Sequence, residues 1–341
     1  MSAFEAPTRG AIGTDRTNTM KAIVQDGYGP PEGLELKDIE KPSSKKDEVL
    51  IRVRAAGVNV ADWAIMSGLP YVARPVYGMG KPKNPVRGTD VAGVVESAGA
   101  GVSRFKAGDE VFGSAEGSFA EFARASEDKL AIKPVNLDFE KAAAAPLAGL
   151  VALQAVRDHG EVQAGQKVLI IGASGGIGTF AVQFAKSLDA EVTGVCSTRN
   201  IEMVRSIGAD HVIDYTTEDV TKKDERYDFI LDNVANLSFA DLRNLLTPTG
   251  TLVPNGGAFD NLWFASGGRV IKAHALKRFV SHDLRPFLVS QKSEDLAPLK
   301  ESIEGGKVTP VIDHIYPLSE TSQAMAHVGE GHTRGKVVIR I

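Results

Sequence analysis

VLIIGASGGIG, residues 168–178, joins four consecutive apolar residues to a turn rich in glycine. An unbroken apolar run of this kind indicates a strand that is buried on both faces. Beyond the turn, apolar residues recur at helical spacing at positions 177, 180, 181, 184, 185 and 188. Strand, glycine turn and helix in this order form the context in which a G-x-G-x-x-G motif binds a dinucleotide.

The motif itself reads Ala173-x-Gly175-x-x-Gly178, with alanine in the first glycine position. Glycines keep side chains away, so that backbone N–H groups and the helix N-terminus can meet a pyrophosphate. We therefore predict cofactor contacts along the whole turn, at Ala173, Ser174, Gly175, Gly176, Ile177 and Gly178. A tight strand-to-helix turn without a ligand is the alternative interpretation.

The rest of the chain divides into two kinds of pattern. Residues 20–133 contain short β-type runs separated by glycine and proline, which predicts a compact, mostly antiparallel domain. After Asp138 helices alternate with strands, which predicts a parallel sheet covered by helices on both faces. The predicted strands are 168–171, 192–196, 211–214, 228–234, 250–254 and about 285–289, followed by helix 294–304, strand 308–316, helix 319–328 and strand 336–341.

Composition narrows the class of protein. A chain of 341 residues exceeds one typical core, so two domains are expected. The net charge of −4 gives no electrostatic reason to expect nucleic acid or an anionic membrane as partner. No apolar run is long enough for a membrane span, and the first nineteen residues lack the apolar region of a secretory signal. Cys196 is the only cysteine, which favours a reducing, cytoplasmic location.

The residues after the second predicted strand indicate the type of dinucleotide. NAD sites place an acid there for the ribose 2′-hydroxyl. Here Ser197, Thr198 and Arg199 follow the strand, and the next acid is Glu202. Hydroxyl groups and a guanidinium suit a 2′-phosphate, so we predict NADPH. The alternative is that Arg199 is an ordinary surface cation.

Several stretches together resemble the medium-chain dehydrogenase/reductase superfamily, and more narrowly its zinc-free quinone oxidoreductase branch. They are AAGVNVADW (55–63), GTDVAGVVESAGAGVSRFKAGDEVFG (88–113), AAAAPLAGLVALQA (142–155), GQKVLIIGASGGIGTFAVQFAK (165–186), GADHVIDY (208–215) and GKVVI (335–339). The resemblance implies an α/β chain with a GroES-like β-rich catalytic domain (20–148 and 291–341), an inserted Rossmann domain (149–290) and an N-terminal extension (1–19).

The resemblance also bears on metal chemistry. Zinc enzymes of the superfamily take ligands from a cysteine and from the histidine of a G-H-E motif. Here the second stretch reads Gly88-Thr89-Asp90 and the first place holds Asn59 to Asp62, and one cysteine cannot build a four-cysteine zinc loop. We therefore expect no metal, and a hydride acceptor that is already electron-poor: a quinone or an α,β-unsaturated carbonyl compound.

Site residues are carried over from the resemblance. Tyr71 is the candidate proton donor and Tyr77 the second, although water could protonate the product while Tyr71 only lines the pocket. Asn59 would bond the substrate oxygen or the nicotinamide ribose, or else hold its own loop. Further cofactor contacts are expected at Tyr215, Asn233, Gly256, Arg334 and Lys336. The last two could instead be surface cations.

Two other functions stay open. An enoyl-thioester reductase could use the basic stretch 73–87, with Arg74, Lys81, Lys83 and Arg87, to hold a phosphorylated carrier; a solvated loop is the alternative. A non-catalytic NADPH-binding protein would keep the cofactor without turnover. A small-molecule substrate is expected in either enzymatic case, and a homodimer is an expectation of the resemblance alone.

Overall fold

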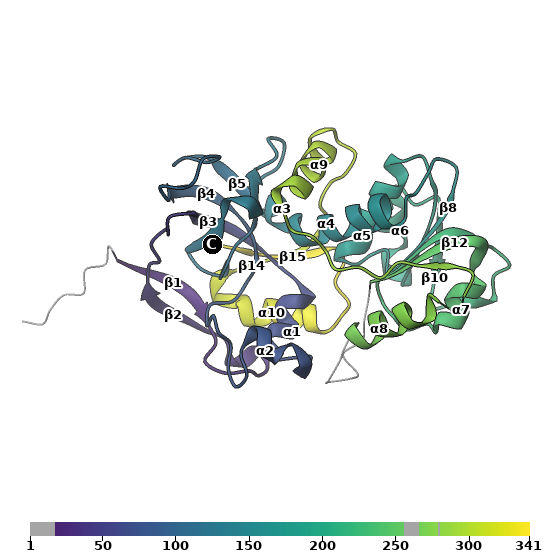
Figure 1. Ribbon diagram of the computed structural model, residues 1–341, viewed down its shortest axis with the longest axis horizontal. Helices are drawn as coiled ribbons and strands as arrows, with labels where there is room; N and C mark the ends of the chain where they lie inside the picture. Colours follow the sequence, from purple (N-terminus) through teal and green to yellow (C-terminus); the bar gives the residue numbers. More distant parts are fainter. Residues whose placement is uncertain (1–17, 256–265, 279) are drawn as a thin grey trace, which may run out of the picture.

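The computed structural model describes residues 18–255, 266–278 and 280–341, which form two lobes (Figure 1). The β-rich lobe contains β1 (Thr19–Val24), β2 (Glu35–Glu40), β3 (Glu48–Val58), β4 (Asp90–Ala98), β5 (Glu110–Ser114), β6 (Phe122–Ser126), β7 (Leu130–Ile132), β14 (Ile312–Pro317) and β15 (Lys336–Arg340). Its helices are α1 (Val60–Ser67), α2 (Arg74–Tyr77), α3 (Phe139–Ala144) and α10 (Thr321–Gly329).

The second lobe contains β8 (Lys167–Ile171), β9 (Glu191–Cys196), β10 (His211–Asp214), β11 (Tyr227–Asp232), β12 (Leu246–Pro254) and β13 (Asp283–Leu284). Its helices are α4 (Pro146–Leu153), α5 (Gly176–Ser187), α6 (Ile201–Ser206), α7 (Phe239–Asn244) and α8 (Ser266–Leu276), and α4 continues as a π-helix, η4 (Gln154–His159). Helix α9 (Ser293–Glu304) lies between the lobes and packs on both α4 and β7. Single 3-10 turns are η1 (Pro31–Gly33), η2 (Tyr71–Ala73), η3 (Glu127–Lys129), η5 (Thr198–Asn200), η6 (Val220–Lys222) and η7 (Leu318–Glu320).

The main sheet of the β-rich lobe joins distant parts of the chain. Its strand order is β14-β15-β3-β4-β5-β7, with β6 also paired to β3 and β1-β2 forming a separate ribbon. The pairings are antiparallel apart from the parallel pair β14–β15, as the short β-type runs predicted. The antiparallel pairing of β15 with β3 brings the segment before Lys336 beside the start of α1.

The six strands of the other sheet are all parallel, in the order β10-β9-β8-β11-β12-β13. In chain order this is the 3-2-1-4-5-6 arrangement of a dinucleotide-binding fold, which binds ligands beyond the carboxyl ends of its strands. Strand β8 is buried on both faces, as predicted: Val168 and Ile170 pack with α4 and α5, whereas Leu169 and Ile171 pack with α7 and α8. The chain thus combines a GroES-like β domain with a Rossmann domain.

Some details differ from the predictions. The sixth parallel strand is only Asp283–Leu284, and the predicted strand at about 285–289 is wrong, because those residues run on as an irregular connection. Pro146 separates α3 from α4, since proline lacks the N–H that a continuing helix needs. The predicted domain boundary after residue 148 falls inside α4, and both boundaries stay predictions.

Candidate functional site

A cavity of about 870 Å³ lies at the carboxyl ends of the parallel strands and reaches into the β-rich lobe. Four groups of residues line it: the glycine turn, the ends of β9 and β10, the loop after β11, and residues 331–337, which we call the C-terminal strap. They include Ile171, Gly172, Ser174–Gly178, Cys196, Ser197, Arg199, Asn200, Tyr215, Asn233, Val234, Asn236, Leu237, Gly331–Thr333 and Gly335–Val337. Residues 58–61, together with Leu147, Ala148 and Val151, contribute to the other side.

The glycine turn is shaped for close approach of a ligand. Gly172 has φ of 77°, a left-handed conformation that favours glycine. A Cβ on Gly178 would lie 2.0 Å from the carbonyl oxygen of Gly172, so the helix can begin this close to the strand only without a side chain. Helix α5 starts at Gly176, and its N-terminus faces the cavity with the positive end of its dipole.

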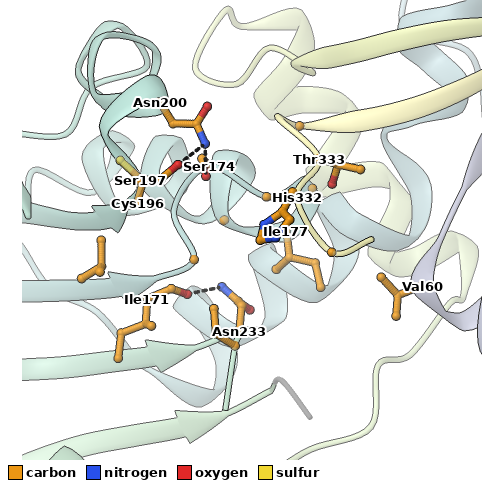
Figure 2. A pocket seen from close by; sticks show the side chains of 18 of the residues that line it. Val60, Ile171, Ser174, Ile177, Cys196, Ser197, Asn200, Asn233, His332 and Thr333 are labelled. Atoms are coloured by element: carbon orange, nitrogen blue, oxygen red, sulfur yellow. Dashed lines mark hydrogen bonds between the residues drawn. The ribbon is translucent and has the colours of Figure 1, made fainter. Parts of the chain in front are cut away.

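Most of the predicted turn residues line the cavity, but Ala173 does not. Its side chain is fully buried, and its N–H donates to the carbonyl of Val195 at 3.0 Å. Figure 2 shows the amide of Asn200 directed at the side chains of Ser174 and Ser197, to which it donates at 3.0 and 3.2 Å. Asn200 is a cavity residue that the sequence did not single out; its only signal was its place after the predicted phosphate-binding residues.

The predicted 2′-phosphate subsite is brought together only in part. Ser197, Arg199 and Tyr215 line the cavity, whereas Thr198 donates its hydroxyl to the carboxylate of Asp214 at 2.5 Å. Hydrogen bonds from Thr198 and Thr216 lower the pKa of Asp214, so this buried carboxylate is ionised at neutral pH. Thr198 therefore holds the end of β10 in this structure.

The C-terminal strap crosses the glycine turn. Gly335 donates to the carbonyl of Ser174 at 2.8 Å and forms a parallel bridge with Gly175. Arg199 donates to the carbonyl of His332 at 2.5 Å, which ties the strap to the end of β9. Arg334 lies outside the set of cavity-lining residues, and its backbone N–H donates to Asp313 at 2.9 Å.

The loop after β11 forms another wall, and its conformation is held by a buried ion pair. Asp232, fully buried, accepts from Arg269 of α8 at 2.5 Å and from the N–H groups of Val234 and Ala235. Ala235 has φ of 67°, which is costly for a residue with a side chain, and Arg269 donates to its carbonyl at 3.4 Å. This pair fixes the wall beside Asn233.

Asn233 itself is well placed. Its amide donates to the carbonyl of Ile171 at 3.3 Å (Figure 2), and its oxygen accepts from Asn255 at 2.8 Å. The apolar side chains of Leu147, Ala148 and Val151 contribute to the cavity lining. Gly256, the remaining predicted contact from this region, lies outside the described residues.

On the β-rich side, Asn59 and Lys336 line the cavity and lead to a buried charged cluster that comprises Asn59, Asp62, Arg87, Asp90 and Lys336. The exposed fraction of each member is 6% or less. The ammonium of Lys336 donates to the side-chain oxygen of Asn59 and, at 2.8 Å, to the carbonyl of Val58. The carboxylate of Asp62 accepts from the N–H of Asn59 at 2.9 Å and from the hydroxyl of Thr89 at 3.2 Å.

Burial dominates the electrostatics of this cluster. It raises the pKa of Asp90 to about 6, against the attraction of Lys336. It also raises the pKa of Asp62 and lowers that of Lys336. From the sequence, Asp62 and Asp90 were noted only as positions in the stretches that lack zinc ligands. The burial of both carboxyls beside a lysine was not predicted.

Tyr71 and Tyr77 lie outside the set of residues that line the cavity. Tyr71 belongs to η2, where the guanidinium of Arg74 lies 4.5 Å from the centre of its ring. The basic stretch is engaged within the protein only in part, because Lys81 is exposed. Arg74 donates to the carbonyl of Gly68, Lys83 donates to that of Pro75, and Arg87 is buried in the charged cluster.

Among residues 18–255, 266–278 and 280–341, no group of three or more His, Cys, Asp or Glu side chains is arranged to hold a metal ion. Over the same residues, no helix combines the length and apolar character needed to cross a membrane.

Comparison with known families now adds to this geometry. The family model for the alcohol dehydrogenase GroES-like domain matches residues 45–135, and that for zinc-binding dehydrogenase matches residues 207–339. A chloroplast envelope quinone oxidoreductase homolog from Arabidopsis thaliana is 34% identical over 336 residues, covering 94% of this chain and 98% of that protein. An NADPH-dependent alkenal/one oxidoreductase, chloroplastic, from the same plant is 33% identical, covering 94% and 79%.

A solved structure with the same fold supports this family. The quinone oxidoreductase from Coxiella burnetii has a TM-score of 0.82 to this chain and is 31% identical, covering 95% of this chain and 99% of that one. Fold and cleft together define an oxidoreductase that uses a nicotinamide cofactor. The chain belongs to the medium-chain dehydrogenase/reductase superfamily, in its quinone oxidoreductase-like branch.

Proposed function

We propose that this chain is a zinc-independent, NADPH-dependent reductase that transfers hydride to quinones or to α,β-unsaturated carbonyl compounds. The observation that carries the proposal is that the glycine turn, the cationic side chain of Arg199 and the amide-bearing residue Asn59 line the same cavity. The printed names of the relatives, quinone oxidoreductase and alkenal/one oxidoreductase, support the acceptor class.

The residues present fit a dinucleotide. The side of Gly175 where a Cβ would point holds only the carbonyl oxygen of Gly172, 3.5 Å away, which leaves room for a pyrophosphate. The glycine turn and the N-terminus of α5 would hold that pyrophosphate, and Asn233 would lie beside the nicotinamide end. When bound, the cofactor supplies hydride, and this chain supplies position and electrostatics.

The preference for NADPH rests on Ser197, Arg199 and Tyr215. No carboxylate follows β9 directly, and Arg199 reaches the cavity with a guanidinium suited to a phosphate. Asp214, the nearby acid at the end of β10, is occupied by the hydroxyls of Thr198 and Thr216. Those bonds reduce its ability to accept from a ribose hydroxyl.

Zinc independence rests on the donor set. The places where zinc relatives carry ligands hold Asn59 and Thr89 here, and the carboxylates behind them already face Lys336 and Arg87. A buried ammonium next to these carboxylates repels a cation. Acceptors whose carbonyls are already conjugated need no metal to accept hydride, and a hydrogen-bond donor suffices for the oxygen that gains charge.

Asn59 is the side chain that we assign to this donor role. It lines the cavity and is 6% exposed, but its amide nitrogen is itself buried in this structure and lies beside the carboxyl of Asp90, so the amide must turn to reach an acceptor. Once turned toward the acceptor, such a donor would stabilise an enolate or a hydroquinone anion more than the neutral acceptor. The proton that completes the reaction would come from water or from Tyr71, whose role stays a prediction.

The experiment that tests the proposal follows loss of the reduced-nicotinamide absorbance. NADPH and NADH are compared against quinones, enones and enals, each with and without a chelator. We expect turnover that continues in the presence of the chelator and is faster with NADPH than with NADH. Turnover abolished by the chelator contradicts zinc independence, and NADPH binding without any turnover favours a binding protein.

The same geometry bears on the alternative of a thioester substrate. On residues 73–87, Arg74 and Arg87 are engaged within the protein, which leaves the exposed Lys81 and Lys83 as the cations that a thioester carrier could meet. Cytoplasmic location and homodimer formation stay predictions, and one relative is named for the chloroplast envelope.

A further inference from the structure

Residues 233–237, which we call the β11 loop, form one wall of the cavity. Asn233, Val234, Asn236 and Leu237 all contribute to its lining. A sheet with this strand order binds a dinucleotide across the crevice where the order reverses, here between β8 and β11. Because the 2′-phosphate end is assigned to β9 and β10, the nicotinamide half of the cofactor would lie on the β11 side, beside this loop.

Two oppositely charged side chains hold the backbone of the β11 loop. The carboxylate of Asp232 accepts from the N–H groups of Val234 at 3.2 Å and Ala235 at 3.0 Å. The guanidinium of Arg269 donates to the carbonyl oxygens of Ala235 at 3.4 Å and Leu237 at 3.0 Å. The carboxylate and the guanidinium are themselves joined at 2.5 Å, so donors and acceptors of the loop are held by one ion pair.

The shape of Arg269 matters as much as its charge. One terminal nitrogen of the guanidinium donates to the loop carbonyls and the other donates to Asp232, a division that a planar fork allows. The guanidinium also lies 4.6 Å from the centre of the ring of Phe239, the first residue of α7. Arg269 belongs to α8 and follows Asp232 by 37 residues, so a separate helix determines the conformation of the loop.

The conformation held in this way places the loop against the glycine turn. Ala235 adopts a φ of 67°, which an alanine keeps only when its surroundings enforce it. A Cβ on Gly172 would lie 2.8 Å from Cγ2 of Val234, so the valine side chain packs against the start of the turn. A loop released from Arg269 would therefore change the cavity where the glycine turn meets the nicotinamide side.

We propose that Arg269 is a positioning residue for the nicotinamide half of the cofactor, which it serves by holding the β11 loop in the conformation that receives this half. The inference rests on the proposed function and deepens it. Arg269 lies outside the described set of residues that line the cavity, so its effect passes through the loop. Its loss should weaken the binding of the nicotinamide half and leave the binding of the adenine half intact.

The experiment compares two ligands by isothermal titration calorimetry. NADPH carries both halves, whereas adenosine 2′,5′-bisphosphate carries only the adenine half with its 2′-phosphate. The variants are Arg269→Met and Arg269→Lys. The double variant Asp232→Asn with Arg269→Met is compared with Asp232→Asn alone, in case an unpaired buried carboxylate prevents folding.

Arg285→Met is the matched control. Arg285 likewise joins a carboxylate to a backbone carbonyl, since it donates to Asp283 at 2.6 Å and to the carbonyl of His159 at 2.9 Å. It is also partly buried, and it does not line the cavity. This variant removes an arginine of the same kind without touching the β11 loop.

In Arg269→Met, the Kd for NADPH should rise about 10-fold, whereas the Kd for adenosine 2′,5′-bisphosphate should stay within about twofold. Arg269→Lys should fall between this variant and the native protein, because one ammonium cannot serve the carboxylate and both carbonyls. Arg285→Met should leave both Kd values within about twofold. Equal weakening of the two ligands in Arg269→Met would overturn the inference, since the change would then act on the whole cofactor domain.

Hydrogen exchange in the cofactor-free protein tests the loop directly. The amides of Val234 and Ala235 donate to Asp232, so their exchange should accelerate about 10-fold or more in Arg269→Met and stay unchanged in Arg285→Met. Unchanged exchange in Arg269→Met would overturn the inference, because Arg269 would then not hold the loop. Faster exchange with an unchanged Kd for NADPH would overturn it as well.

Failure of the proposed function has a different signature. If the native protein binds NADPH but reduces no quinone, enone or enal, the proposed acceptor class is wrong, and the two Kd values still decide the role of Arg269. If the native protein turns over and Arg269→Met binds NADPH as tightly, the inference fails and the proposed function stands. A native protein that binds neither ligand would overturn both.

Discussion

The two ends of the cavity are built in different ways. At one end, the glycine turn and the start of α5 come from a single run of eleven residues, 168–178, and act through backbone groups. At the other end, the charged cluster draws side chains from α1 and its cap, from the segment leading into β4, and from β15, which lies more than 240 residues further along the chain. A local motif can be recognised from its spacing, whereas a cluster of this kind exists only after the strands have paired.

The two ends of the cavity also tolerate different kinds of substitution. The turn depends on the absence of a side chain at Gly178, where an added Cβ would meet the backbone of Gly172. The cluster depends on a balance of opposite charges, so its properties depend on pH and on its partners. Each prediction below tests one side of this contrast.

The largest effect is expected in the glycine turn. In Gly178→Ala, the new Cβ would meet the carbonyl oxygen of Gly172 at 2.0 Å, so we expect a loss of about 3 kcal/mol in the free energy of unfolding. Urea denaturation measures it. Gly33→Ala is the control, because a Cβ there meets nothing within 4 Å. Equal stability of the two variants would show that the turn does not need its glycine.

The charged cluster should make the free energy of unfolding depend on pH. Burial raises the pKa of Asp90 to about 6, so the native state keeps this proton where the unfolded state has lost it. The contribution of Asp90 to stability is therefore present at acidic pH and is lost as pH rises from about 4 to about 6. Lys336, Asp62 and Arg87 are the charged members around it.

Asp90→Asn should remove that loss. Relative to the native protein, the variant should gain roughly 3 kcal/mol in the free energy of unfolding between pH 4 and pH 7, as an upper value. Denaturation curves at four pH values measure the difference between the two proteins, in which the other carboxyls cancel. A difference that stays constant with pH would mean that Asp90 titrates normally.

A smaller effect is expected at the cationic end of the cavity. Arg199→Ala should weaken NADPH binding about 10-fold and leave NADH within about threefold, since only NADPH carries the 2′-phosphate. Fluorescence titration of the two cofactors measures both values. Arg205→Ala is the control, because Arg205 is an exposed arginine on the next helix and pairs with Glu202. Equal weakening of both cofactors would instead assign Arg199 to holding the strap through His332.

The smallest effect is expected for Tyr71→Phe, with kcat within about twofold of the native value. Tyr71 lies outside the cavity lining, and the guanidinium of Arg74 lies 4.5 Å from the centre of its ring, so we expect water to supply the proton. A general acid contributes about 100-fold or more. A loss of that size would restore Tyr71 as the proton donor and would require the η2 segment to move.

Much of the fold could be predicted from the sequence because its signals are local. The apolar run of β8, the stripe on α5 and the break at Pro146 each depend on neighbouring residues. The wrong sixth strand, expected at about 285–289, had no such support, since apolar residues in a short stretch fit a strand or a packed loop equally well.

The residues of the site could likewise be predicted only where their signals are local. The turn residues that line the cavity follow from spacing, whereas Ala173 and Thr198 face inward for reasons set by β9 and by Asp214. The pairing of Lys336 with Asn59 depends on the antiparallel register of β15 with β3, which no local pattern encodes. The role of Arg269, which holds the loop after β11, likewise arises from a helix far along the chain.

The bridge between Gly175 and Gly335 has a consequence for synthesis of the protein. The parallel sheet and its glycine turn emerge from the ribosome first, but the strap that crosses the turn follows some fifty residues after β13. Until the strap is made and β15 has paired with β3, the cavity lacks a wall. Cofactor capture is therefore a late event for a nascent chain, and proteolysis within residues 331–337 should release the cofactor while leaving the sheet folded.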